Sequence, residues 1–292
     1  MKQVIDKIPN GKCLVAVSGG ADSMALLHML KDVPGIEVAH VNHRIRPDSM
    51  EDQKLVTEFC EQHKIPLQIR MLLNPPKTGI EEWARNQRYE FFTFLMELLD
   101  IPYLLTAHNA NDQAETVIMK MMRGTGVKGL RGIHRNTGSI VRPLLDMTKD
   151  EIYAYCAANS VPFREDYTNK DTKYFRNKVR HEILDKKHIP QLCRIADLAQ
   201  SAYPKILSAA KKEMRQFITR TEDRIVIDRK LVLDDLAFIF IADLVSDWFS
   251  MSELGYELMK STAPETKLFI FRGTKITCDK RSPKNIKLIR KT

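Results

Sequence analysis

Features that the sequence lacks exclude several classes of protein. The 292 residues contain no run of about 18 apolar residues, so no membrane-spanning helix is predicted. The first residues show no apolar segment followed by a small-residue cleavage site, and we expect no secretory signal. No cysteines form a C-x-x-C pair, which argues against a structural zinc site or a disulfide framework and fits a reducing cytoplasm: Cys13, Cys60, Cys156, Cys193 and Cys278.

The charge of the chain is displaced towards the basic side. It has 46 Lys and Arg residues against 37 Asp and Glu residues, a formal net charge of +9. A basic protein favours polyanionic partners, because neutralising phosphates releases counterions. A solvated charged surface explains the same composition, so the charge alone does not decide between the two interpretations.

The first part of the chain alternates short apolar runs with amphipathic stretches, the pattern of parallel α/β units. Strands are predicted at 13–17, 36–41, 67–72, 103–107 and 140–144, and helices at 22–31, 48–63, 80–99, 111–122 and 148–159. In the helix at 48–63, Met50, Leu55 and Phe59 are expected to face inward, and Glu51, Asp52, Lys54 and Glu58 outward. Thr148 and Glu151 match a capping box. The succession indicates a doubly wound, mostly parallel sheet with helices on both faces.

The remainder of the chain has a different pattern. Residues 124–138 are rich in glycine and are predicted to form a loop, and residues 189–219 a connecting helix. Strands are predicted at 224–228, 268–272 and 286–289, the last two joined by a basic, turn-rich piece, and an apolar helix at 231–249. We therefore expect a catalytic domain at 1–188, a helical connector at 189–220 and a small α+β domain at 221–292.

The clearest local signal is a phosphate loop, residues 18–23, between the first strand and the first long helix. It reads Ser18-Gly19-Gly20-Ala21-Asp22-Ser23. Two glycines allow close approach of an anion, and free N–H groups at the start of the helix favour a phosphate there. No Lys follows Gly20 as a Walker A loop requires, and no G-x-G-x-x-G is present. A tight strand-to-helix turn is the alternative interpretation.

With this loop the chain resembles the PP-loop ATP pyrophosphatases, whose signature is Ser-Gly-Gly-x-Asp-Ser. The resemblance implies cleavage of ATP to AMP and pyrophosphate with Mg²⁺, and Asp22 as the Mg²⁺ partner. Further segments resemble one branch of the family, the tRNA(Ile)-lysidine synthetases. They are HVNHRIR at 40–46, EEWARNQRY at 81–89, TAHNANDQAET at 106–116, RGTGVKGL at 123–130, RPLL at 142–145, EDYTN at 165–169 and RNKVRH at 176–181.

The resemblance implies a reaction and its residues. ATP adenylates the wobble cytidine of the isoleucine tRNA with the anticodon CAU, and L-lysine then displaces AMP. ATP would be bound by the phosphate loop, namely Ser18, Gly19, Gly20, Ala21, Asp22 and Ser23, with His40 and His108. Catalysis is assigned to Asp22, Arg88, Asp112, Glu115 and Arg180, and lysine binding to Asp112 and Glu115.

Each assignment has a structural alternative. Asp112 and Glu115 lie three residues apart and share a helix face, but acids at a helix start also favour its dipole. Arg88 alone would be interpreted as a solvated helix charge. For His40 and His43, a structural histidine is an equally good interpretation.

RNA contacts are expected from basic residues in two later segments: Arg123, Lys128, Arg131, Arg176 and Lys178. The basic tail fits RNA backbone binding, with a solvated surface almost as good an explanation: Arg272, Lys275, Lys280, Arg281, Lys284, Lys287, Arg290 and Lys291.

A homodimer is compatible with the sequence. Two alternatives remain, a tRNA thiolase, which generally needs a cysteine pair or an iron–sulfur cluster, and an inactive RNA-binding module.

Overall fold

The computed structural model describes residues 2–44, 48–76, 78–165, 175–214, 218–220, 224–228, 269–271, 274–279 and 282–290. Contacts between Cα atoms divide the chain into two units, residues 1–125 with 129–197 and residues 126–128 with 198–292. The predicted boundaries at 188 and 220 stay a prediction. Some predicted features lie outside the described residues: the helix at 231–249, motif residues 45, 46 and 166–169, and, in the tail, Arg272, Lys280, Arg281 and Lys291.

The first unit is built on a six-stranded sheet with the order β3-β2-β1-β4-β6-β5. Its strands are β1 (Cys13–Ala16), β2 (Ile36–Asn42), β3 (Leu67–Met71), β4 (Tyr103–Leu105), β5 (Asn136–Thr137) and β6 (Ile140–Val141). All neighbouring pairs are parallel except the antiparallel pair β5–β6. The predicted fold class, a doubly wound and mostly parallel sheet, is confirmed.

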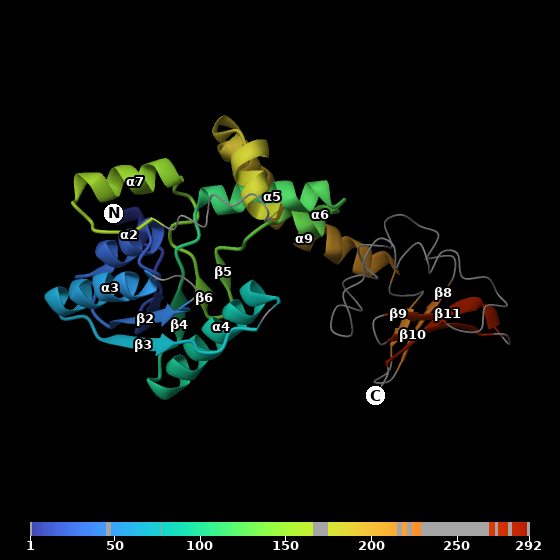
Figure 1. Ribbon diagram of the computed structural model, residues 1–292. Helices are drawn as coiled ribbons and strands as arrows, with labels where there is room; N and C mark the ends of the chain where they lie inside the picture. The colour runs from blue at the N-terminus through green and yellow to red at the C-terminus, as the bar shows by residue number, and fades with distance from the viewer. Residues whose placement is uncertain are drawn as a thin grey trace. The chain divides into compact units, whose positions relative to one another are not determined.

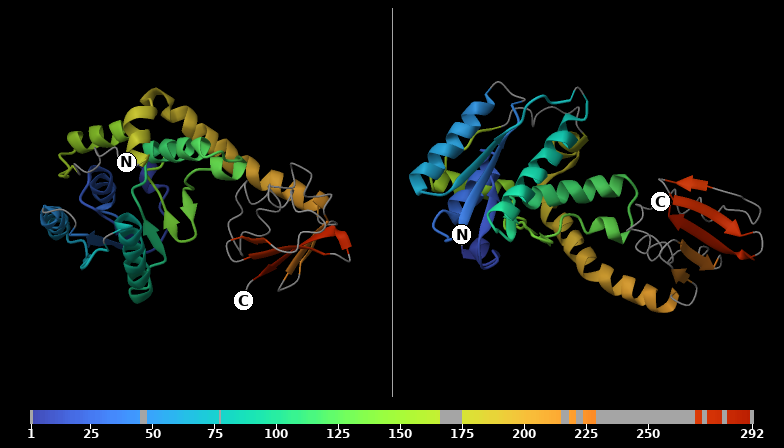
Figure 2. Two further views of the ribbon diagram at one scale, coloured as in Figure 1. Left: turned by 45° about the vertical axis from the view of Figure 1, so that its right-hand side comes forward. Right: turned by 90° about the horizontal axis from the view of Figure 1, so that it is seen from below.

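Strand β1 explains why the sheet is covered on both faces. Its alternate side chains point to opposite sides. Cys13 and Val15 join a core with α2 (Ala21–Leu30), α3 (Ser49–His63) and α7 (Lys149–Ala158), whereas Leu14 joins the core under α4 (Ile80–Leu98). Figures 1 and 2 show α2 and α3 on one side of the sheet and α4 on the other. An apolar run without polar alternation is expected of such a central parallel strand.

Side-chain caps fix the first turns of two helices. In α5 (Ala110–Met122), the Asn109 side chain accepts from the Asp112 N–H at 3.1 Å, and the Asp112 carboxylate accepts from the Asn109 N–H at 3.0 Å. In α7, Thr148 and Glu151 form the predicted capping box. Such caps satisfy N–H groups that have no partner within the helix.

The last part of the first unit returns the chain to α5. It contains α8 (Phe175–Lys178), the π-helix η2 (Val179–Ile183), the 3₁₀-helix η3 (Lys186–His188) and the start of α9 (Ile189–Met214). Ile189 packs with Ala110 and Ala114 in a small apolar cluster. This packing holds α8 and η2 close to the helix that carries Asp112 and Glu115. The short helix α1 (Lys2–Ile5) precedes the sheet.

The second unit contains an antiparallel sheet with the order β7-β8-β11-β10-β9. Its strands are β7 (Ile218–Arg220), β8 (Arg224–Asp228), β9 (Phe269–Phe271), β10 (Thr274–Asp279) and β11 (Ser282–Arg290). The predicted strands at 224–228, 268–272 and 286–289 correspond to β8, β9 and β11. No helix in the described ranges is both long and apolar enough to cross a membrane.

Several local predictions were wrong. The helix predicted at 189–219 ends at Met214 and is followed by β7, and β10 replaces the predicted turn-rich connection. The predicted loop at 124–138 contains the short helix α6 (Val127–Leu130) and β5. The three missed strands are short or weakly patterned and owe their conformation to pairing with β8, β9, β11 and β6, which local propensity does not report.

The predicted faces of α3 were wrong at two positions. Met50 is exposed although it was expected to face inward, and Asp52 is buried although it was expected to face outward. The reason is a polar contact that the apolar period does not report, since Arg164 donates to the Asp52 carboxylate at 3.0 Å. Val56, Phe59 and Cys60 form the apolar face of this helix.

Two leucines on α4 test the position of the core. Leu95 is 3% exposed and Leu98 is 64% exposed. We expect Leu95→Ala to lower the free energy of unfolding by about 2–5 kcal/mol, because it leaves a cavity in the core. Leu98→Ala should change it by less than about 0.5 kcal/mol. Urea unfolding of both variants checks this, and equal effects would contradict the packing described.

Candidate functional site

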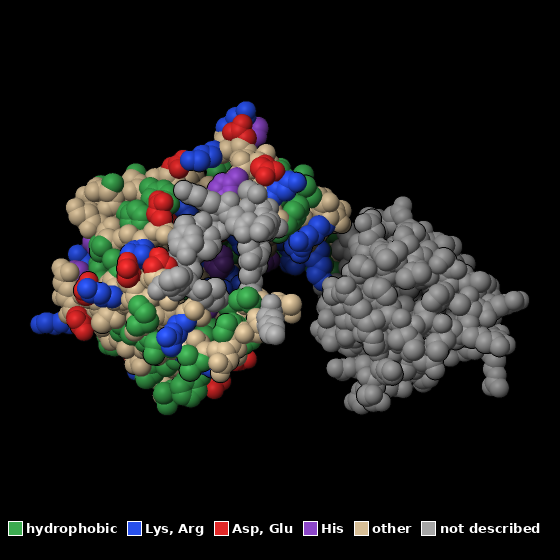
Figure 3. All heavy atoms as spheres, viewed as in Figure 1, with side chains coloured by type: hydrophobic (Ala, Val, Ile, Leu, Met, Phe, Trp, Pro, Cys, Tyr) green, Lys and Arg blue, Asp and Glu red, His purple; other side chains and the backbone are tan. Residues whose placement is uncertain are grey.

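A cleft of about 580 Å³ opens at the carboxyl ends of β1, β2 and β4. Because β1 lies between β2 and β4, the connections that leave these strands run to opposite sides, and ligands bind at such a switch point in open α/β sheets. In Figure 3, histidine and basic side chains are visible in a hollow of the first unit. The lining includes the ends of all three strands, with Val17, Asn42 and Thr106.

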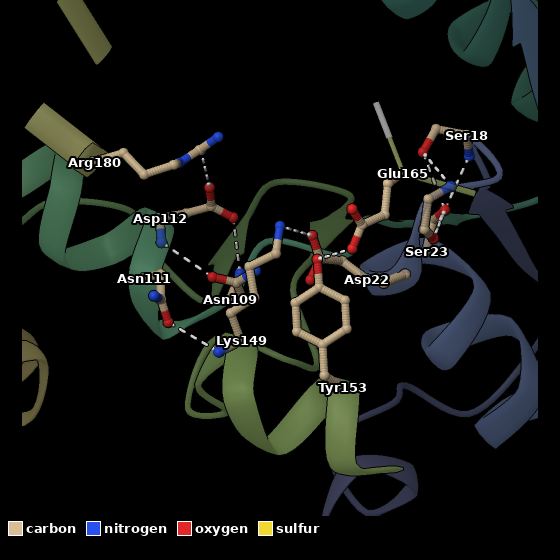
Figure 4. A network of polar contacts seen from close by, with 12 residues as sticks. Ser18, Asp22, Ser23, Asn109, Asn111, Asp112, Lys149, Tyr153, Glu165 and Arg180 are labelled. Atoms are coloured by element: carbon tan, nitrogen blue, oxygen red, sulfur yellow. Dashed lines mark hydrogen bonds and ion pairs between the residues drawn. The ribbon is translucent and has the colours of Figure 1, made fainter. Parts of the chain in front are cut away.

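Hydrogen bonds of its own serines stabilise the turn of the phosphate loop. The Ser23 hydroxyl accepts from the Ser18 N–H at 3.1 Å and donates to the Gly20 carbonyl at 3.0 Å. Gly20 is the N-cap of α2 and provides no side-chain cap. The first N–H groups of α2 are therefore available to an anion, and the positive end of the helix dipole favours one there. Figure 4 shows Ser18, Ser23 and Asp22 on this turn.

Gly19 is required by the close approach of α3 to the phosphate loop. Its φ of +93° is disfavoured for residues with a side chain, and a Cβ atom there would lie 3.2 Å from the Asp52 Cβ. On the other side, the Arg164 N–H donates to the Gly19 carbonyl at 3.0 Å. The Arg164 guanidinium donates to Asp52 and to Asp48, at 3.0 and 2.9 Å, and to Glu51. Arg164 thereby ties the phosphate loop to the first turn of α3.

One wall of the cleft carries arginines without acidic partners. Within the described part of the chain, neither Arg85 nor Arg88 forms an ion pair, and the Nε atom of Arg88 is buried without a hydrogen-bond partner. Arg85 stacks over the Tyr89 ring at 4.7 Å. Burial, reinforced by the like charge of Arg85, lowers the pKa of Arg88. Charges left uncompensated in this way favour binding of an anion.

A carboxylate pair on α5 faces the two arginines of α8 and η2. Arg176 donates to Asp112 Oδ1 and to Glu115 Oε2, each at 2.7 Å. Arg180 donates to Glu115 Oε1 at 2.6 Å and to Glu115 Oε2 at 3.1 Å. Although burial alone would lower it, pairing with Glu115 and Asp112 raises the pKa of Arg180. The predicted shared face of Asp112 and Glu115 is present, and Asp112 also serves the capping box.

Asp22 fits the predicted role of a magnesium ligand. Its Oδ1 atom is buried without a hydrogen-bond partner, and its Oδ2 atom lies 3.6 Å from the Lys149 ammonium (Figure 4). Burial raises the pKa of Asp22, Lys149 opposes this shift and the like charge of Asp112 reinforces it. Among the described residues no three His, Cys, Asp or Glu side chains gather as a metal cluster. Mg²⁺ needs only one or two carboxylates when phosphates and waters complete its shell.

Two histidines line the cleft in different states. His40 is buried and its Nδ1 lies 2.9 Å from the Val17 carbonyl, so Nδ1 carries the proton and Nε2 is an acceptor without a partner. Burial lowers the pKa of His40. His108 Nδ1 lies 3.0 Å from the Thr106 hydroxyl, and burial lowers the pKa of His108 to about 4. Both rings are therefore neutral at pH 7.

The structure brings together most of the residues predicted from the sequence. The cleft is lined by Ser18, Gly20, Asp22, Ser23, His40, Arg88, His108, Asp112 and Arg176. Gly19 and Ala21 belong to the same turn, and Glu115 and Arg180 join through ion pairs with Arg176 and Asp112. Arg176 contacts the two carboxylates in this structure, and its predicted contact with RNA stays a prediction.

The other predicted RNA contacts lie apart from the cleft lining or in the second unit. Arg123 stacks over Phe175 at 5.7 Å, and Lys178 is exposed, 4.0 Å from Glu182. Arg131 is half-buried, and Lys128 is exposed on α6 in the second unit.

Sequence reasoning missed four polar contributors to the site. Asp52 and Arg85 line the cleft. Lys149 pairs with Asp22, and Arg164 donates to the Gly19 carbonyl of the phosphate loop. Arg85 could have been found, because it precedes Arg88 by three residues and shares its helix face. Arg164 gave no local signal, since its partners lie more than 110 residues earlier in the chain.

Comparison with known proteins gives a consistent result. The PP-loop domain family matches residues 1–187. The tRNA(Ile)-lysidine synthase of Lactiplantibacillus plantarum is 39% identical over 220 residues, which cover 70% of this chain and 49% of that protein. The tRNA(Ile)-lysidine synthase of Treponema denticola is 36% identical over 252 residues, 80% of this chain and 53% of that protein. The chain spans about half the length of the curated relatives it matches.

One solved structure supports the fold. The tRNA thiolase NcsA of Methanococcus maripaludis, determined with its 4Fe-4S cluster, aligns with a TM-score of 0.55 and 19% sequence identity. The alignment covers 69% of this chain and 76% of that one. At this identity the likeness concerns the arrangement of strands and helices alone.

The low pKa of His108 predicts how stability depends on pH. Between pH 6.5 and about 4 the unfolded chain protonates this ring while the folded protein does not. The unfolded state then binds more protons, so the free energy of unfolding falls as the pH falls through this window. The titration of His108 should make the free energy of unfolding about 2 kcal/mol lower at pH 5 than at pH 7.

His108→Gln should remove that part of the pH dependence. Urea unfolding of both proteins at pH 7 and pH 5 measures the difference, and His63→Gln, at a half-buried position on α3, is the matched control. An unchanged pH dependence in His108→Gln would contradict a buried neutral ring.

Proposed function

We propose, because the chain belongs to the PP-loop domain family, that this protein is an ATP-dependent ligase of the tRNA(Ile)-lysidine synthetase type. In this proposal, O2 of the wobble cytidine in the CAU anticodon attacks the α-phosphate of ATP and releases pyrophosphate. The ε-amine of L-lysine then forms a bond to C2, and AMP leaves. The observation that carries the proposal is one cleft lined by the phosphate loop, by Arg85 and Arg88 and by Asp112.

The phosphate loop and the two arginines on the wall of the cleft, Arg85 and Arg88, would bind ATP together. The N–H groups at the start of α2 suit the pyrophosphate end, and Arg85 and Arg88 suit the negative charge that develops on the α-phosphate. The free Nε2 atom of His40 is an acceptor, matched to an amino or hydroxyl donor of the nucleoside. Neutral His108 beside Thr106 would add polar contacts without adding charge.

Mg²⁺ would be held by Asp22 together with phosphate oxygens. When bound, it supplies a positive charge that stabilises the leaving pyrophosphate. The chain's own part is to keep one carboxylate oxygen of Asp22 available. In the described part of the chain, Lys149 lies near Oδ2, and no hydrogen-bond partner is found for Oδ1.

Asp112 and Glu115 would receive the lysine substrate, since carboxylates pair with ammonium groups. The Glu115 side chain is 1% exposed, and a buried carboxylate without a positively charged partner is costly. A positive group is therefore strongly favoured beside it. Arg180 would remain to stabilise negative charge on the adenylate phosphate. A carboxylate can also accept the proton that the amine loses when it attacks C2.

The tRNA would be held by basic residues outside this centre. We assign Arg123, Lys128, Arg131, Lys178 and, when it is not paired with carboxylates, Arg176 to phosphate contacts. The connector at 189–220 and the small domain at 221–292 would contact the tRNA body, where the described strands carry Lys275, Lys284, Lys287 and Arg290.

A tRNA thiolase is the less favoured alternative. Sulfur transfer would need a reactive cysteine at the site, and no described residue lining the cleft is a cysteine. Cys13, Cys60 and Cys156 are buried. Burial raises the pKa of Cys60 to about 11 and that of Cys193 also to about 11, which disfavours their thiolates.

Incorporation of labelled lysine tests the proposal. The full chain is incubated with Mg²⁺, ATP and an unmodified isoleucine tRNA with the CAU anticodon, and label in the RNA is counted. Asp112→Asn should lower the rate roughly 10- to 100-fold, because a hydrogen bond to a charged group contributes about 1.5–3 kcal/mol. Asn keeps an oxygen for the helix cap, so the fold should survive the change.

Glu58→Gln on the exposed face of α3 is the matched control and should leave incorporation unchanged. No ATP-dependent label, with a tRNA that a known lysidine synthetase accepts, would refute the lysidine proposal. Sulfur incorporation by the same protein would instead support the thiolase alternative.

A further inference from the structure

The carboxylate pair proposed to bind lysine is already paired with two arginines. Asp112 Oδ2 accepts from the Asn109 N–H, and Asp112 Oδ1 accepts from Arg176. Both oxygens of Glu115 accept from Arg180, and Oε2 also accepts from Arg176. Two carboxylates and two guanidiniums sum to no net charge. Each of the four oxygens already accepts at least one hydrogen bond, and a further ammonium group finds no excess negative charge to bind.

Arg176 is the arginine that can leave. Its side chain is 42% exposed, whereas that of Arg180 is 25% exposed. Arg180 bonds to both oxygens of Glu115, while Arg176 divides its bonds between Asp112 and Glu115. Water can solvate Arg176 as it leaves, so its departure costs less than that of Arg180.

The departure of Arg176 would open a site that suits lysine. Asp112 Oδ1 and Glu115 Oε2 would each lose the hydrogen bond that they now accept from Arg176, at 2.7 Å in both cases. The ammonium nitrogens of lysine could take the places of the two guanidinium nitrogens. Two carboxylates with Arg180 alone carry a net charge of −1. Lysine with both ammonium groups and its carboxylate carries +1, so the charges match.

Arg176 also lines the cleft that the phosphate loop and Asp22 line. A guanidinium released from the carboxylates therefore has phosphate oxygens of a bound nucleotide within the same cleft, and Arg binds phosphate well. We infer that Arg176 is an exchangeable counter-ion of the lysine site, which lysine displaces towards the nucleotide phosphates. This inference rests on the proposed function.

The exchange couples the two substrates. A nucleotide that attracts Arg176 vacates the carboxylates, so ATP strengthens lysine binding, and by thermodynamic linkage lysine strengthens ATP binding by the same factor. Arg176 is thus a positioning residue whose charge opposes lysine binding when no nucleotide is present. Its removal should have an effect opposite to that of removing a substrate contact.

Direct binding measurements test the exchange. Equilibrium dialysis of labelled lysine against the full chain is carried out with and without Mg²⁺ and a non-hydrolysable ATP analogue. For the unaltered protein we expect the analogue to lower the dissociation constant of lysine by roughly fivefold or more. Arg176→Gln should bind lysine at least about fivefold more tightly without nucleotide, and the analogue should then have little further effect.

Lys187→Gln is the matched control, because Lys187 is an exposed cation of η3 whose ion-pair partner is the exposed Asp185. It should behave as the unaltered protein. Arg176→Lys keeps the charge without the two-pronged geometry and should restore part of the nucleotide effect. Thermal unfolding of each variant verifies that it is folded.

The outcomes separate the inference from the function it rests on. If Arg176→Gln binds lysine as weakly as or more weakly than the unaltered protein, while Lys187→Gln is unchanged, the inference is overturned and the function stands. If no form binds or incorporates lysine although the analogue binds, the proposed function itself fails, and the inference with it.

Discussion

The contact between the phosphate-loop backbone and the Asp52 side chain is the constraint on which the cleft depends. Only a glycine at position 19 allows α3 to come so close, and Arg164 holds both partners, through the Gly19 carbonyl and the Asp52 carboxylate. This contact orients the start of α2, and the start of α2 defines where an anion can bind. Ser18 and Ser23 stabilise a turn whose position is determined by Asp52 and Arg164.

The sequence predicted the frame of the first unit because its strands and helices have local patterns. β1 is an apolar run, α7 has a capping box, and the phosphate loop has a spacing tied to one conformation. The same reasoning failed where distant residues decide. Asp52 is buried because Arg164, 112 residues later, pairs with it, and β10 is a strand because β9 and β11 flank it. Arg176 was predicted from its basic character, and no local rule pairs it with carboxylates on α5.

Charge is distributed unevenly around the cleft, and that distribution gives each wall its own chemistry. The wall of Arg85 and Arg88 has positive charge that no acidic side chain of the described residues pairs with, which suits a ligand that brings its own negative charge. The opposite group of Asp112, Glu115, Arg176 and Arg180 is balanced within itself, so it can take up a cation only by exchange. A reaction between a phosphate-bearing and an ammonium-bearing substrate needs both kinds of surface next to each other.

The double use of Asp112 limits how this cleft can change in evolution. One of its oxygens closes the first turn of α5, and the other faces the arginines. A replacement without a side-chain acceptor would also remove one of the two capping-box hydrogen bonds of the helix that carries Glu115. New specificities are therefore more accessible through Arg176, whose side chain supports no secondary structure, than through the carboxylates themselves. The position that is easiest to vary is the counter-ion, and the acidic pair is retained by the fold as well as by the chemistry.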